Sequence, residues 1–180
     1  NVLLSYLLSH NAQETIVLAV EACLQLSEID LLLPQAMLDE LKAKVVSKRY
    51  FVSRIPSSAV DDLIARLSAI GELVTSPMIP DIYTRDRKDD YLVACGVVLE
   101  ADFLVSGDLD LRVLGQVGTV RIVTPAEFVR ELLAATGTVG AEQFHHAAAH
   151  QRGLERRAAA PLGLVHGAGE QDQPALQLLA

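Results

Sequence analysis

The fold class is decided by the stretch ADFLVSGDLDL, residues 101–111. Its apolar centre predicts a buried strand over 102–106, which ends at Gly107 and Asp108. A helical pattern precedes this strand over 91–100, and a short helical stretch follows it over 109–114. Strands that alternate with helices favour parallel pairing through right-handed crossovers.

The same alternation extends to both sides of this stretch. Residues 2–33 read as apolar helical stretches that end in a buried strand over 29–33. Helices are predicted over 35–46, 58–70 and 125–133, and a further strand is predicted over 120–123. We therefore expect an α/β fold, a three-layer α/β/α sandwich with a parallel sheet.

Composition agrees with one such domain. The chain has 180 residues, 51% of them hydrophobic but only 4% aromatic, and no Trp, which argues against an all-β fold. The net charge of −8 argues against a protein that coats nucleic acid through bulk charge, but a metal-dependent nuclease stays open. No apolar run is long enough to span a bilayer, so a cytoplasmic location is expected. Cys23 and Cys95 lie far apart, without the spacing of a zinc site.

A domain over residues 1–136 is expected, followed by a tail over 137–180. The tail is rich in Ala, Gly and Gln, holds four of the five histidines and lacks a clear amphipathic period. It is therefore predicted to have weak structure. His146 and His150 have the spacing of a metal pair on a helix, but no third ligand accompanies them.

Acidic residues cluster where the predicted strands end and helices begin. Each has an ordinary explanation when taken alone, as a helix cap, a first-turn carboxylate or a solvated side chain. If the strands around residues 31 and 104 are neighbours, however, these carboxylates converge at one sheet edge. Such a set needs raised pKa values or a hard divalent cation, Mg²⁺ or Mn²⁺. The residues concerned are Glu40, Asp86, Asp89, Asp90, Asp108 and Asp110.

Basic residues offer a second signal. The stretch 41–60 contains no acidic residue, and further cations lie near the proposed acidic site. They either hold RNA phosphates or form an ordinary solvated face, and the sequence leaves both readings open. The candidates for RNA binding are Lys42, Arg85, Arg87 and Arg112.

Four segments in order resemble the PIN domain family, in the branch of toxin-antitoxin toxins related to VapC-type ribonucleases. These are residues 32–42, the pair 85–94 and 101–111, and residues 121–128, within a similarity that covers about 1–134. The resemblance implies an endoribonuclease dependent on Mg²⁺ or Mn²⁺, often a homodimer, acting on single-stranded RNA and inhibited by an antitoxin protein. It implies metal-binding and catalytic roles for Glu40, Asp90 and Asp108, with Asp110 as a further ligand and Ser106, Asp86 and Asp89 as auxiliary residues.

The chain departs from the family pattern at its start. The family opens with a central strand ending in Asp-x-Asn, and Asn1 matches the Asn of that motif, so the first Asp and its strand are missing from this sequence. We therefore expect weak or no ribonuclease activity from residues 1–180. The alternatives are a catalytically silent PIN domain that binds an antitoxin or a second copy, and a receiver-like domain, which the absence of a late-strand Lys disfavours.

Overall fold

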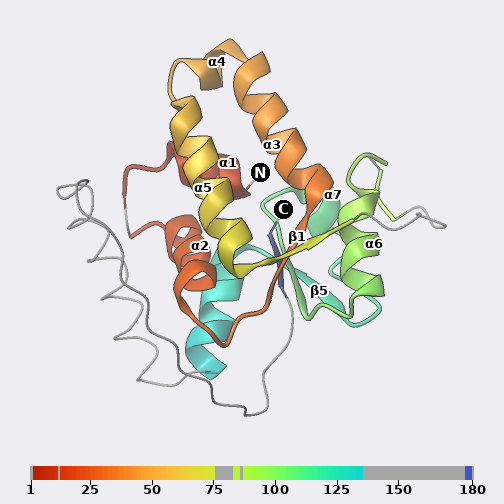
Figure 1. Cartoon of the computed structure of the whole chain (residues 1–180). Helices are drawn as coiled ribbons and strands as arrows, with labels where there is room; N and C mark the ends of the chain where they lie inside the picture. The colour runs from red at the N-terminus through yellow and green to blue at the C-terminus, as the bar shows by residue number, and fades with distance from the viewer. Residues whose placement is uncertain (1, 12, 76–82, 86, 136–176, 180) are drawn as a thin grey trace.

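The computed structural model describes residues 2–11, 13–75, 83–85, 87–135 and 177–179 (Figure 1). The helices are α1 (Val2–Leu8), α2 (Thr15–Gln25), α3 (Gln35–Ser47), α4 (Arg49–Val52), α5 (Ser57–Ile70), α6 (Asp90–Val98), α7 (Leu109–Arg112) and a helix over 125–135. The strands are β1 (Leu31–Pro34), β2 (Glu72–Val74), β3 (Phe103–Val105), β4 (Gln116–Val117), β5 (Val120–Val123) and β6 (Gln177–Leu179).

The strands form one sheet in the order β2-β1-β6-β3-β5-β4. All neighbouring pairs are parallel except β4 and β5, which form an antiparallel hairpin through residues 118–119. Gly118 has a φ of 61°, a conformation that costs little only for glycine. The predicted parallel α/β fold is thus confirmed.

The centre of the sheet is occupied by β6, from the far end of the chain. Gln177 and Leu178 pair with Leu31 and Leu32 of β1, while the other edge of β6 pairs with β3 over residues 103–105. β1 and β3 therefore belong to one sheet but are not direct neighbours, because one strand lies between them. No element is predicted from the sequence over 177–179, and residues 137–176 of the predicted tail lie outside the described residues.

Helices cover both faces of the sheet. On one face the ring of Phe128, from the helix over 125–135, packs edge-on against Phe103 of β3, with ring centroids 5.9 Å apart. On the other face α6 approaches β5 closely, because a Cβ added at Gly96 would lie 3.2 Å from the side chain of Val120. Figure 1 shows the resulting layers, with α2 and the helix over 125–135 on one side of the strands and α6 on the other.

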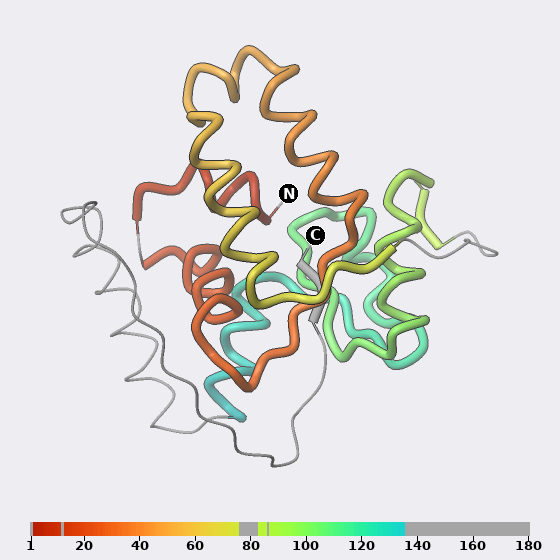
Figure 2. Tube along the Cα trace, viewed as in Figure 1, coloured from red at the N-terminus to blue at the C-terminus, as the bar shows by residue number. Residues whose placement is uncertain are grey.

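A helical hairpin made of α3, α4 and α5 projects from the sheet (Figures 1 and 2). The helix predicted over 35–46 is confirmed as α3, and that predicted over 58–70 as α5. The short helix α4 at the tip was not anticipated, because four residues carry no periodic signal. The arrangement places the first turns of α3 directly after β1, at the carboxyl end of the sheet.

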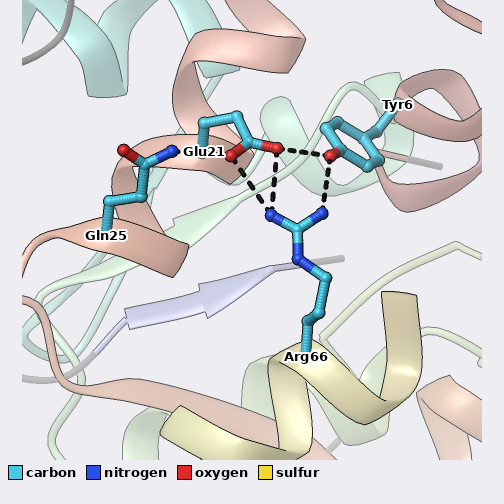
Figure 3. Close-up of polar contacts among 4 residues, drawn as sticks. All are labelled: Tyr6, Glu21, Gln25 and Arg66. Atoms are coloured by element: carbon cyan, nitrogen blue, oxygen red, sulfur yellow. Dashed lines mark hydrogen bonds and ion pairs between the residues drawn. The ribbon is translucent and has the colours of Figure 1, made fainter. Parts of the chain in front are cut away.

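A buried polar cluster joins α1, α2 and α5 (Figure 3). The Glu21 side chain is only 3% exposed and lies 3.3 Å from the guanidinium of Arg66. Tyr6 donates its hydroxyl hydrogen to the same carboxylate, and Gln25 donates from Nε2 at 2.8 Å. A buried carboxylate is tolerated when it is paired and hydrogen-bonded in this way. The cluster fixes α1, whose first turn reaches the cavity described next.

Candidate active site

One cavity of about 280 Å³ lies at the carboxyl ends of β1 and β3. This is the position at which open parallel sheets bind their ligands. Its walls come from α1, α3, the start of α6 and the segment after β3. The residues that line it are Leu3, Leu4, Met37, Glu40, Leu41, Lys44, Lys88, Asp89, Tyr91, Leu92, Ser106, Asp108 and Leu111.

Glu40 contributes one carboxylate from α3. β1 ends at Pro34 and α3 begins at the next residue, so Glu40 lies in the second turn of the helix, with Met37 and Leu41 of the same helix buried. Its Oε1 lies 2.8 Å from the Nζ of Lys44, one turn further along. The cavity therefore contains a carboxylate with its countercharge beside it.

Asp108 contributes a second carboxylate from the turn after β3. Its Oδ1 accepts the backbone N–H of Asp110 at 2.9 Å, which caps α7. Its own N–H donates to Oγ of Ser106 at 3.1 Å, and Ser106 is buried. The capping role foreseen for Asp108 is thus present, and it holds the carboxylate at the cavity wall.

The two acidic residues at the start of α6 have different surroundings. Asp89 lines the cavity, whereas Asp90 is buried and does not line it. Oδ1 of Asp90 accepts three hydrogen bonds, from the N–H groups of Tyr83 and Thr84 and from Oγ1 of Thr84, at 3.1, 2.6 and 2.7 Å. Burial opposes ionisation, but the hydrogen bonds from Thr84 and Tyr83 outweigh it and lower the pKa of Asp90. Asp90 thereby fixes the segment before α6.

Tyr91 is a cavity residue that the sequence did not single out. Its Oη is buried and, alone among the buried side-chain polar atoms of the described residues, has no hydrogen-bond partner. Burial raises the pKa of Tyr91, and the nearby charges of Glu40 and Asp89 raise it further. Glu40 thus lies close to the Tyr91 hydroxyl, and both residues line the cavity. An unsatisfied hydroxyl in a cavity indicates room for a polar ligand or a water molecule.

The remaining predicted site residues lie outside the cavity walls. Asp110 pairs with Arg85, whose Nη2 lies 3.2 Å from Oδ2, and Lys42 pairs with Asp61 of α5 at 3.6 Å. Arg112, at the end of α7, is exposed. Arg87 is also exposed, and its charge helps to lower the pKa of Asp90. Asn1 and Asp86 lie outside the described residues.

The oxygen atoms that line the cavity are of the kind that binds a hard divalent cation, but the side chains that carry them do not lie close enough together to form a complete metal site. Carboxylate oxygens are the ligands that Mg²⁺ and Mn²⁺ prefer, and Glu40, Asp89 and Asp108 supply them beside the unsatisfied Oη of Tyr91. Over the parts of the chain that the structure describes, however, no three acidic, His or Cys side chains lie close enough together to hold a metal ion.

A profile of the PIN domain family matches residues 1–110. The match spans more than half of the chain, so the chain belongs to the PIN domain family. PIN domains are usually nucleases and generally use divalent metal ions. No curated protein and no solved structure matches the chain significantly. Of the helices within the described ranges, none combines the length and the apolar character that crossing a membrane requires.

Proposed function

We propose that the cavity is the active site of a divalent-metal-dependent endoribonuclease that cleaves single-stranded RNA and serves as the toxin of a toxin-antitoxin pair. One observation carries the proposal. Glu40, Asp89 and Asp108, from three separate segments, line a single cavity at the carboxyl ends of β1 and β3. Carboxylates gathered at that edge of a parallel sheet are typical of metal-assisted phosphodiester hydrolysis.

Each residue has a distinct role in this proposal. Mg²⁺ or Mn²⁺, when bound, supplies an activated water and stabilises the leaving oxygen. Glu40, Asp89 and Asp108 line the cavity and would hold the cation. Asp90 and Asp110, which lie outside the cavity walls, would position the segments around them. Ser106 keeps Asp108 in place through its hydrogen bond.

Cations around the cavity bind the RNA backbone in this proposal. Lys44 and Lys88 line the cavity itself and would contact the phosphate nearest the carboxylates. The cations predicted from the sequence extend the contact to flanking nucleotides. These are Lys42, Arg85, Arg87 and Arg112.

Because residues 1–180 alone are expected to cleave weakly or not at all, the test uses the chain extended before Asn1 by a short apolar strand ending in Asp-Thr. Cleavage of an end-labelled single-stranded RNA with Mn²⁺ or Mg²⁺ is compared between this extended chain and the same chain carrying Asp108→Asn. Asparagine caps a helix as well as aspartate does, so the fold is kept while a charged ligand is lost. We expect cleavage to fall by about a hundredfold, the upper range for disturbing a metal site. Asp62→Asn in the extended chain, at an exposed residue of α5 outside the cavity, is the matched control and should cleave like the extended chain itself. Cleavage that persists in EDTA, or equally in Asp108→Asn, would refute the proposal.

A second candidate is a catalytically silent PIN domain that binds an antitoxin or a second copy of itself. The observation that favours it is the lack, among the described side chains, of three metal-binding groups in mutual reach. The same assay separates the candidates. A protein that binds RNA or forms a stable dimer but shows no cleavage with any divalent cation is the silent module.

A further inference from the structure

We infer that the tip of the helical hairpin, residues 46–54, is a second contact surface for single-stranded RNA. At this tip Tyr50 and Arg54 form a stacking surface for an unpaired base, and the neighbouring cations hold phosphates. The inference rests on the proposed function in taking RNA as the ligand, and it adds a surface outside the cavity. The tip lies at the end of the hairpin farthest from the sheet (Figures 1 and 2).

The hairpin tip carries positive charge that no acidic residue balances. The chain as a whole has a net charge of −8, yet residues 41–60 contain five basic residues and no acidic one. Two of the five pair with carboxylates elsewhere. The other three, Lys48, Arg49 and Arg54, are exposed and form no ion pair with any residue that the structure describes. A polyanion is the ligand that fits such a patch on an otherwise acidic protein.

Tyr50 presents an aromatic ring beside these cations. The residue is 55% exposed, and the guanidinium carbon of Arg54 lies 4.0 Å from the centroid of its ring. Nη1 of Arg54 donates to the backbone oxygen of Tyr50 at 3.2 Å, which holds the guanidinium over the ring. Aromatic rings and guanidinium planes are the surfaces on which proteins stack unpaired bases. A base that joins this pair continues a stack that the protein has already begun.

Two apolar side chains anchor the hairpin tip to the core. Phe51 packs against the buried cluster, Ile55 is only 2% exposed, and the N–H of Ile55 donates to the carbonyl oxygen of Phe51 at 2.8 Å. By contrast, Val46, Tyr50 and Val52 are each at least 55% exposed. The anchored turn therefore holds Tyr50 at the surface, where a ligand can reach it.

The hairpin tip is within reach of a strand bound in the cavity. α3 runs from the cavity, where Glu40 and Lys44 line the wall, to the tip, where the helix ends at Ser47. A helix rises about 1.5 Å per residue, so Ser47 lies about 10 Å beyond Glu40 along the axis. Stacked nucleotides rise about 3.4 Å each along a strand, so about three of them cover this distance. One RNA molecule can thus contact the cavity and the tip together.

An anionic membrane is the other large polyanion that a basic tip could meet. Membrane binding of this kind scales with the apolar area that a helix buries in the lipid. α4 has only four residues, and two exposed valines are the only large apolar side chains beside the ring of Tyr50. The stacked pair of ring and guanidinium suits bases better than lipid, so RNA is favoured.

The first test measures binding of a labelled single-stranded RNA of about ten nucleotides by fluorescence anisotropy in EDTA. EDTA prevents metal-dependent cleavage, so the result does not depend on nuclease activity. Tyr50→Leu should weaken binding about tenfold, whereas Tyr50→Phe keeps the ring and should bind like the unchanged chain. Tyr50 is exposed, so neither change removes a buried side chain. Duplex RNA offers no free base faces along its length, and its binding should be the same in Tyr50→Leu and the unchanged chain.

Three results would overturn the stacking surface. They are equal binding of the single strand by the leucine and phenylalanine variants, an equal loss for single strand and duplex in Tyr50→Leu, and no binding of RNA by the unchanged chain. If the tip binds RNA as expected but the extended chain does not cleave it, the proposed nuclease fails and the tip stands.

The second test uses salt to count phosphate contacts. Arg49→Gln should reduce the slope of log affinity against log salt by about 0.7, the share of one phosphate contact on a single strand. Arg130→Gln removes an exposed arginine from the helix over 125–135, at the opposite end of the molecule in Figure 1, and should leave the slope unchanged. Equal slopes in the two variants would overturn the phosphate contact. Vesicles of phosphatidylserine and phosphatidylcholine should not bind the chain, and vesicle binding that Arg49→Gln abolishes would assign the tip to a membrane instead.

Discussion

The Nζ of Lys44 lies 2.8 Å from Oε1 of Glu40, one turn away along α3, and both side chains line the cavity. The spacing of four residues, with Glu before Lys, is the favourable orientation for an ion pair on a helix. In the cavity, however, the ammonium group stands next to a carboxylate that the nuclease proposal assigns to a cation. On that proposal, Lys44 and the metal ion would compete for Glu40.

The first prediction follows from this competition. Lys44→Gln should tighten Mn²⁺ binding by up to about fivefold, because a partly exposed ion pair contributes about 0.2–1 kcal/mol and its loss frees Glu40. The measurement is the rise in melting temperature across an Mn²⁺ titration. Lys42→Gln is the control, since Lys42 pairs with Asp61 outside the cavity. Equal Mn²⁺ affinities in the two variants would show that Lys44 does not compete.

The second prediction separates the roles of Asp108 and Asp90. Asp108→Asn keeps the cap of α7 and should leave the melting temperature nearly unchanged, while the response to Mn²⁺ is lost. Asp90→Asn weakens three hydrogen bonds to a buried charged group and should cost about 1–2 kcal/mol, which lowers the melting temperature by about 4 °C. Thermal unfolding with and without Mn²⁺ measures both effects. The assignment fails if Asp108→Asn proves the less stable of the two.

The third prediction concerns acid. The folded state lowers the pKa of Asp90, so its ionised form stabilises the fold at pH values above its unfolded pKa of about 3.9. This contribution is lost as the pH falls through that value toward the lower folded pKa. The difference in melting temperature between the unchanged chain and Asp90→Asn should thus be constant above about pH 5 and shrink below about pH 4. A difference that stays constant down to pH 3 would contradict it.

Local sequence patterns were sufficient for most elements of the fold. β1, α3, α5 and β5 have apolar runs or helical periodicity that identify them, and Thr124 with Glu127 forms the capping box that starts the helix over 125–135. The two-residue strand β4 and the four-residue helix α4 are too short to carry a period. The position of β6 was beyond local reasoning for a different reason. Which strand fills the space between β1 and β3 depends on pairing between residues about 75 and 145 positions apart.

The sequence predicted where the candidate site lies better than it predicted which residues line it. Strand ends and helix starts placed Glu40 and Asp108 at one edge of the sheet, and both line the cavity. The sequence could not decide between the adjacent acids Asp89 and Asp90, because that choice depends on the turn before α6, where Thr84 binds Asp90. Tyr91 gave no signal at all, since a tyrosine in the first turn of an apolar helix usually belongs to the core. The roles of these residues in catalysis remain predictions for the variants above.

The last prediction tests the buried cluster of Figure 3. Arg66→Ala removes the cation beside Glu21, whose side chain is 3% exposed, and leaves a buried carboxylate without its countercharge. Breaking a buried pair in this way typically costs about 3 kcal/mol or more, measurable by urea unfolding. Adding Glu21→Gln to Arg66→Ala removes the unpaired charge, while Tyr6 and Gln25 can still bond to the neutral side chain. The double variant should therefore recover about 1–2 kcal/mol of the loss. If the single variant costs less than about 0.5 kcal/mol, as an exposed ion pair would, Glu21 is solvated and the cluster does not fix α1 against α2 and α5.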